Sequence, residues 1–96
     1  YIGVTISETY DAETLKSYGF PVGAVVNNVV SGGPADVAGI RRGDIITEFN
    51  GVEITNYTKL EEAISSCKPK DTVTFKIYRS RKYYSANIII GSNNSQ

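Results

Sequence analysis

A dense run of turn-forming residues in the middle of the chain limits the folds available to it. Residues 29–51 have the sequence VVSGGPADVAGIRRGDIITEFNG. The Ser-Gly-Gly at 31–33 stops an apolar run, because glycine adopts positive φ angles easily, and Pro34 suits the first turn of a helix. The Gly-Asp at 43–44 and the Asn-Gly at 50–51 are typical turn dipeptides. The segment therefore predicts a strand, a loop, a short helix, a turn, a second strand and a turn.

The rest of the chain shows further strand and helix patterns. Residues 1–6 alternate, so that Ile2, Val4 and Ile6 share one face. The other predicted strands are residues 23–30, 44–49, 52–54, 72–79 and 82–90, the last two joined by a tip at Ser80-Arg81. Asp11 is a candidate N-cap for a short helix with the apolar residues Ala12, Leu15 and Tyr18. A second helix begins near Asn56 and places Leu60, Ala63, Ile64 and Cys67 on one buried face.

These elements predict an α+β, mainly β fold. We expect a partly open antiparallel β-barrel of five to six strands, capped by two to three helices. A chain of 96 residues suits one domain, which we expect at residues 1–90. Residues 91–96 are uncharged and rich in Ser and Asn, which predicts a flexible tail or linker. Because the chain starts inside a predicted strand and lacks Met, we expect it to be a piece of a larger protein.

Composition argues against several functions. The formal net charge is zero, so strong general attraction to nucleic acid is not expected. The chain has no histidine and a single cysteine, Cys67, which argues against Ser-His-Asp or Cys-His catalysis, zinc binding and an internal disulfide. Ser31 precedes two glycines, as in trypsin-like nucleophile loops, but Val30 precedes it instead of Gly-Asn. We expect no catalytic residue, metal or cofactor, and no apolar run is long enough to span a bilayer.

Two parts of the sequence resemble the PDZ domains of the HtrA/DegP family of trypsin-like serine proteases. Residues 1–4, Tyr-Ile-Gly-Val, resemble the opening of these domains, and residues 34–44 resemble their Pro-Ala to Gly-Asp block. The resemblance covers residues 1–90 and implies a PDZ-like fold. It also implies that a peptide with a free C-terminus adds as a strand beside residues 3–6 and opposite the second helix.

The resemblance implies a set of peptide-binding residues. Glycine at Gly3 lets a terminal carboxylate approach backbone N–H groups closely. Tyr57 and Glu61 match positions on the groove helix, where Tyr57 packs on the ligand and Glu61 favours a basic ligand side chain. The expected set is Tyr1, Ile2, Gly3, Val4, Thr5, Ile6, Tyr57, Leu60, Glu61 and Ile64. Plain core packing is the alternative for the aliphatic residues, and a solvated helix face is the alternative for Tyr57 and Glu61.

The resemblance also implies partners and a location. The expected partners are peptide C-termini or unfolded proteins, and the protease domain of the parent chain. The resemblance implies a setting in the cell envelope or elsewhere outside the cytoplasm, with membrane anchoring of the parent as one alternative. Alternatives are a PDZ domain of another protease or secretion component, and a docking domain whose groove is unused. Arg79, Arg81 and Lys82 form a basic cluster, either a solvated hairpin tip or a membrane or partner contact.

Overall fold

The computed structural model describes residues 2–7 and 9–91, and within them it contains six strands and three helices. The elements are β1 (Val4–Ile6), α1 (Ala12–Ser17), β2 (Ala24–Val29), α2 (Pro34–Val37), β3 (Ile45–Phe49), β4 (Val52–Glu53), α3 (Tyr57–Ser65), β5 (Thr72–Arg79) and β6 (Lys82–Ile89). The mainly β class expected from the sequence is confirmed. Tyr1 and residues 92–96 lie outside the described residues, so the domain boundary stays a prediction.

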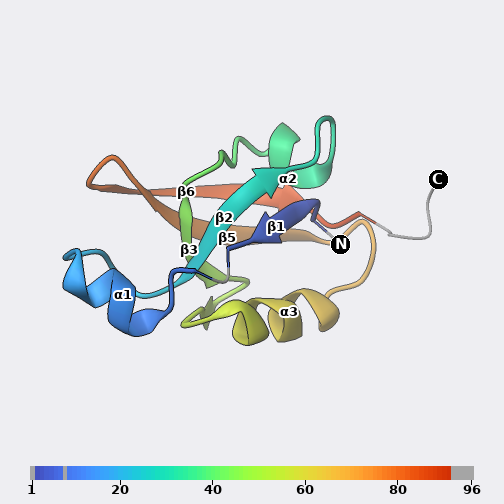
Figure 1. Cartoon of the computed structure of the whole chain (residues 1–96). Helices are drawn as coiled ribbons and strands as arrows, with labels where there is room; N and C mark the ends of the chain where they lie inside the picture. Colours follow the sequence, from blue (N-terminus) through green and yellow to red (C-terminus); the bar gives the residue numbers. More distant parts are fainter. Residues whose placement is uncertain (1, 8, 92–96) are drawn as a thin grey trace.

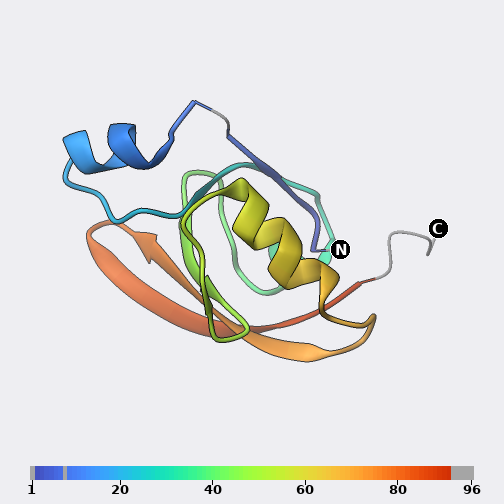
Figure 2. The ribbon, with the colours of Figure 1, turned by 90° about the horizontal axis from the view of Figure 1, so that it is seen from below.

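The strands form one antiparallel sheet that does not close. Their order is β1-β2-β3-β5-β6, and β4 pairs with β3 beside this path. The sheet therefore has β1 at one edge and β6 at the other. Figures 1 and 2 show α3 and α2 on opposite sides of the strands, with α3 alongside β1.

The hairpin of β5 and β6 follows directly from its sequence. Val73, Phe75 and Ile77 are buried and alternate with more exposed residues, as expected for a strand with one apolar face. Arg79 pairs with Lys82, which leaves a two-residue loop. Ser80 and Arg81 in that loop have φ angles of 53° and 66°, as a type I′ hairpin turn requires. The predicted tip at these two residues is confirmed.

The first strand is shorter than the predicted span of residues 1–6. It begins at Val4, because Gly3 has a φ angle of 79°, outside the extended region. Ile2 is nevertheless buried, and Val4 and Ile6 pack partly buried against the same core. The expectation that Ile2, Val4 and Ile6 contact one core is confirmed, but a continuous strand through Gly3 was wrong.

Side-chain caps fix the starts of two helices. The Asp11 carboxylate accepts a hydrogen bond of 2.9 Å from the Thr14 N–H at the start of α1. The Asn56 side chain accepts an equivalent bond of 2.9 Å from the Lys59 N–H at the start of α3. Both predicted caps are confirmed. Tyr18, which was grouped with the apolar residues of this helix, is its C-cap and is 61% exposed, whereas Leu15 is buried.

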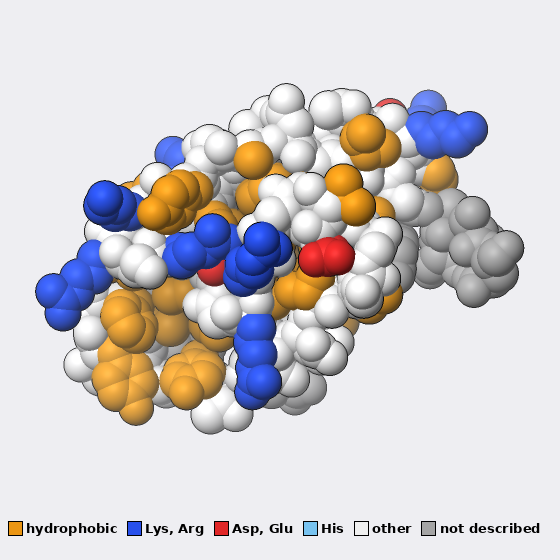
Figure 3. All heavy atoms as spheres, turned by 90° about the horizontal axis from the view of Figure 1, so that it is seen from above, with side chains coloured by type: hydrophobic (Ala, Val, Ile, Leu, Met, Phe, Trp, Pro, Cys, Tyr) orange, Lys and Arg blue, Asp and Glu red, His pale blue; other side chains and the backbone are white. Residues whose placement is uncertain are grey.

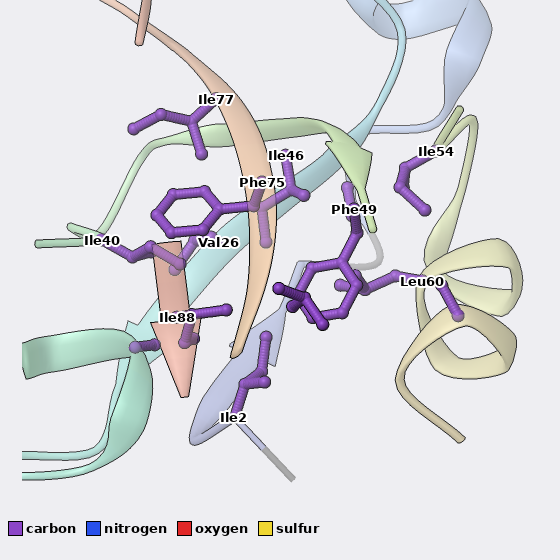
Figure 4. Close-up of a cluster of buried hydrophobic side chains, with 14 of the residues drawn as sticks. Ile2, Val26, Ile40, Ile46, Phe49, Ile54, Leu60, Phe75, Ile77 and Ile88 are labelled. Atoms are coloured by element: carbon purple, nitrogen blue, oxygen red, sulfur yellow. The ribbon is translucent and has the colours of Figure 1, made fainter. Parts of the chain in front are cut away.

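The main core lies between the curved sheet and α3. Figure 4 shows Phe49 and Ile54 beside Leu60, which projects inward from α3. Ile2 enters the same cluster from the segment before β1. Burial of one such large side chain contributes about 2 kcal/mol to folding, so this cluster fixes α3 against the sheet next to β1.

Candidate functional site

The outer edge of β1 borders a hollow. β1 pairs with β2 on one side, and α3 runs alongside it on the other (Figure 2). A hollow of about 330 Å³ lies there, lined by Val4, Thr5, Ile6 and Tyr57. We call this hollow the β1–α3 groove. An exposed strand edge facing a helix can accept an extended peptide as an additional strand.

The backbone at the start of the groove is oriented by two hydrogen bonds. The Ile2 carbonyl accepts a bond of 2.8 Å from the Ala35 N–H, and the Gly3 carbonyl accepts one of 2.9 Å from the Val30 N–H. In a trans peptide the N–H points opposite to the carbonyl. The N–H groups of Gly3 and Val4 therefore both point away from Ala35 and Val30. The positive φ angle of Gly3 allows these two successive donors to lie on the same side.

The register of β1 against β2 extends this row of polar groups. Val4 is paired with Val29, one step beyond the bond between Gly3 and Val30. Hydrogen-bonded and non-bonded pairs alternate along an antiparallel ladder. Val4 is therefore in a non-bonded pair, with its N–H and C=O directed away from β2 and toward the open edge. Val4 can thus offer one donor and one acceptor to an added strand.

The α3 side of the groove carries an aromatic ring next to a carboxylate. Tyr57 is the first residue of the helix, and its side chain is about half exposed. Its hydroxyl donates a hydrogen bond of 2.6 Å to Oε2 of Glu61, one turn later. This spacing is the usual one for side chains that meet on a helix surface. The bond fixes a negatively charged group near the Tyr57 ring.

The structure brings together only part of the predicted site. Val4, Thr5, Ile6 and Tyr57 line the groove. The remaining described residues lie beneath or beside it: Ile2, Gly3 and Leu60 are buried, Ile64 is half-buried against the core, and Glu61 is exposed. Tyr1 lies outside the described residues. The peptide-binding role of the whole set stays a prediction.

Sequence reasoning missed an extension of the groove toward α1. A second hollow of about 520 Å³ shares Ile6 and Tyr57 with the groove and is also lined by Tyr10, Asp11 and Asn56. Asp11 is the N-cap of α1 and Asn56 is the N-cap of α3, so the N-terminal ends of both helices border this hollow. Hydrogen bonds from the backbone and the side chain of Thr14 lower the pKa of Asp11 from its ordinary value of 3.8. The extension therefore contains an ionised carboxylate at neutral pH.

The described part of the chain offers no group of three His, Cys, Asp or Glu side chains suited to a metal ion. No helix among the described residues is long and apolar enough to cross a membrane. Cys67 is half-buried, and its thiol donates to the Ala63 carbonyl at 3.3 Å. This environment agrees with the structural role expected for Cys67.

The sequence matches a known family and several curated proteins. A family model described as "PDZ domain" matches residues 1–90. A "Probable periplasmic serine endoprotease DegP-like" of Chlamydia trachomatis is 38% identical over 84 residues, which cover 85% of this chain and 17% of that protein. A "Serine protease Do-like HtrA" of Lactococcus lactis is 37% identical over 73 residues, covering 76% of this chain and 18% of the relative. The chain thus spans less than a fifth of the length of these relatives.

Solved structures show the same fold. The "HtrA-type protease AlgW with decapeptide" superimposes with a TM-score of 0.81 at 22% identity, over 95% of this chain and 28% of that one. The "HtrA3 PDZ Domain Bound to a Phage-Derived Ligand (FGRWV)" gives a TM-score of 0.74 at 23% identity, over 93% of this chain and 83% of the other. Both of these structures contain a peptide according to their descriptions.

Proposed function

Because the chain belongs to the PDZ domain family and is of the HtrA/DegP type, we propose that it binds extended peptide segments with a free C-terminus in the β1–α3 groove. The observation that carries the proposal is the open edge of β1, which lies beside a hollow lined by Val4, Thr5, Ile6 and Tyr57. The HtrA-type neighbours described with bound peptides support it.

The peptide is held mainly by backbone groups. Its terminal carboxylate lies at the N–H groups of Gly3 and Val4, which both point away from the body of the domain. Its backbone then pairs with the free N–H and C=O of Val4 along the edge of β1. A few such bonds and one or two buried side chains correspond to a Kd near 1 μM, or about −8 kcal/mol.

Side-chain preference comes from the two walls of the groove. Val4 and Ile6 provide an apolar surface for the last side chain of the ligand, supported from below by buried Ile2. On α3, the Tyr57 ring packs against the third-from-last ligand residue. The adjoining Glu61 carboxylate favours a ligand with a basic side chain.

We extend the proposal to the parent chain through the relatives. Relatives named periplasmic serine endoproteases support a parent that is a serine endopeptidase working outside the cytoplasm. In such a parent this domain presents exposed C-termini of misfolded proteins to the protease domain, or signals their presence to it. The described residues contain no histidine, so the domain itself supplies binding and not catalysis.

Backbone amide NMR tests the proposal with paired peptides. A peptide ending in a free hydrophobic C-terminus should shift the amides of Gly3, Val4 and Tyr57. The same peptide with an amidated C-terminus should bind at least tenfold more weakly, because the carboxylate no longer meets the two N–H groups. Equal shifts from both peptides would contradict carboxylate capture. No shift at β1, with a folded spectrum, would favour a docking domain with an unused groove.

A pair of glycine variants separates binding from stability. Gly3 and Gly19 both adopt left-handed φ angles, of 79° and 77°. Alanine at either position takes an unfavourable positive φ angle, but Gly19 lies in the turn after α1, away from β1. Gly3→Ala should lose peptide affinity, whereas Gly19→Ala should lose only stability. Equal affinities in the two variants would argue against the role given to Gly3.

A further inference from the structure

A second surface carries a row of aromatic rings; it shares no lining residue with the β1–α3 groove and shares Tyr10 with the extension of that groove. The ring centroids of Tyr10 and Tyr18 are 6.4 Å apart, those of Tyr18 and Phe20 are 6.0 Å apart, and those of Phe20 and Tyr78 are 6.1 Å apart. Tyr83 continues the row at 5.1 Å from Tyr78. Tyr10, Tyr18, Phe20 and Tyr83 are each more than two-fifths exposed. A contiguous row of exposed aromatic side chains is unusual on a solvated surface and is typical of an interaction site.

Arginine side chains border one side of this aromatic row. A hollow of about 670 Å³ is lined by the rings of Phe20 and Tyr78 and by Arg41, Arg42 and Arg81. A neighbouring hollow of about 370 Å³ shares Phe20 and is lined by Tyr10 and Tyr18. Figure 3 shows basic side chains beside exposed hydrophobic ones at the left end of the molecule in that view. We call the two hollows together the aromatic–basic surface.

The positive charge of this surface is not balanced by the acidic residues that the structure describes. Among them, Asp44 is the one that lines the larger hollow, and it pairs with Arg79. Among the described residues, no ion pair involves Arg41, Arg42 or Arg81. All three are exposed. Since the whole chain has a formal net charge of zero, this local excess of cations is a distinct feature of one end of the domain.

We propose that the aromatic–basic surface is a second peptide-binding site, which takes an acidic segment carrying a large apolar side chain next to its carboxylates. The apolar side chain enters the smaller hollow between Tyr10, Tyr18 and Phe20. The neighbouring carboxylates meet Arg41, Arg42 and Arg81, whose guanidinium groups bind carboxylates in a bidentate manner. Phe20 lines both hollows, so the two kinds of side chain must be close in the ligand sequence.

The shape of the surface favours a peptide over a bilayer. A membrane contact places aromatic and basic side chains on a protruding surface that enters the headgroup region. Here the rings and the arginines line two adjoining concave hollows. A side chain that protrudes from a peptide can enter such a hollow, whereas a flat lipid surface would cover the hollow and leave it unfilled.

The test uses a peptide that the β1–α3 groove cannot hold by a terminal carboxylate. A fluorescent peptide with Trp between Glu residues, acetylated and amidated at its ends, should bind and shift the amides of Arg41, Arg42 and Arg81. Replacing its Glu residues by Lys, or its Trp by Ser, should weaken binding at least tenfold. Raised salt should weaken it as well, because the contacts are exposed ion pairs.

Matched variants locate the binding. Arg41→Gln/Arg42→Gln should weaken binding at least tenfold, whereas Lys59→Gln/Lys68→Gln, with the same change in charge at exposed positions of α3 and the following turn, should not. Equal loss in both double variants would overturn the site. So would absence of binding, or capture by phosphatidylglycerol vesicles that the acidic peptide does not displace. A free C-terminal hydrophobic peptide in the same titration should shift the amides of Gly3, Val4 and Tyr57 but not those of the three arginines, so each site fails or succeeds independently.

Discussion

Asp44 and Arg79 form a two-pronged ion pair that joins the start of β3 to the end of β5. Arg79 Nε donates to Asp44 Oδ1 at 2.7 Å, and Nη2 donates to Oδ2 at 2.6 Å. Nη2 also donates to the Gly39 carbonyl at 2.8 Å, so the pair holds the loop after α2 as well. Asp44 is 1% exposed. The hydrogen bonds from Arg79 to Asp44 raise the pKa of Arg79 above its ordinary value.

Removal of the Arg79 guanidinium should strongly destabilise the domain. Arg79→Met leaves the buried Asp44 carboxylate without its cation, and such a change costs about 3–5 kcal/mol. Arg81→Met makes the same chemical change two residues away, at an exposed side chain that forms no ion pair with any residue the structure describes. It should alter the free energy of unfolding by less than about 0.5 kcal/mol. Urea unfolding of both variants measures the difference. Similar losses in the two would show that the ion pair contributes little.

Local parts of the fold could be predicted because neighbouring residues determine them. The alternation through Val73, Phe75 and Ile77 predicts β5, and Asn56 predicts the start of α3. In each case the cause, side-chain alternation or a capping side chain, lies within a few residues of the element that it predicts. The short β1 could not be foreseen from alternation alone. The φ angle of Gly3 depends on the hydrogen bonds that the N–H groups of Ala35 and Val30 donate to the carbonyls of residues 2 and 3.

Contacts between distant residues escaped prediction. The basic residues at the hairpin tip were expected to form one cluster, but Arg79 turns inward to Asp44, 35 positions away, while Arg81 stays exposed. In the groove, Tyr57 and the β1 residues were foreseen through the family resemblance. The helical spacing predicts a buried face for Leu60, but it does not tell whether that face meets the core or the ligand space. That result depends on how α3 is rotated against Phe49 and Ile54.

The carboxylate on α3 should tune peptide preference in the β1–α3 groove. Glu61→Gln keeps an oxygen that accepts the Tyr57 hydroxyl bond but removes the charge. Affinity for a peptide with Lys at the third-from-last position should fall about two- to fivefold, the size of an exposed ion pair. Affinity for the same peptide with Met there should stay unchanged. Glu62→Gln, one position along the same helix, is the control. Isothermal titration calorimetry measures the Kd of both peptides for each variant. An equal loss of affinity for the Lys and Met peptides would argue against a charge effect.

The turn before β5 offers a position where glycine should stabilise the domain. Lys70 has a φ angle of 75°, which strains a side chain with a Cβ, while its N–H donates to the Ile90 carbonyl at 2.7 Å. Lys70→Gly relieves backbone strain of about 1 kcal/mol in the folded chain. Glycine also raises the conformational entropy of the unfolded chain, which opposes folding by a smaller amount, so the free energy of unfolding should rise by about 0.5 kcal/mol. Lys68 does not have a positive φ angle, and Lys68→Gly should lower stability by a similar amount. Thermal unfolding of both variants measures the two signs. Destabilisation by Lys70→Gly would contradict the strain argument.

The cap of α1 should weaken in acid. The Thr14 hydrogen bonds lower the pKa of Asp11 below 3.8 in the folded chain. A carboxylate with a lowered folded pKa stabilises the fold fully above its unfolded value, and this stabilisation is lost as the pH falls through the folded pKa. The Thr14 amide shift, followed by NMR from pH 6 to pH 2, should therefore titrate with a midpoint below 3.8. Asp11→Asn, which caps without titrating, should remove that transition, and the Lys59 amide on the uncharged Asn56 cap should not share it. A Thr14 midpoint at or above 3.8 would show that Asp11 does not cap α1 as a carboxylate in solution.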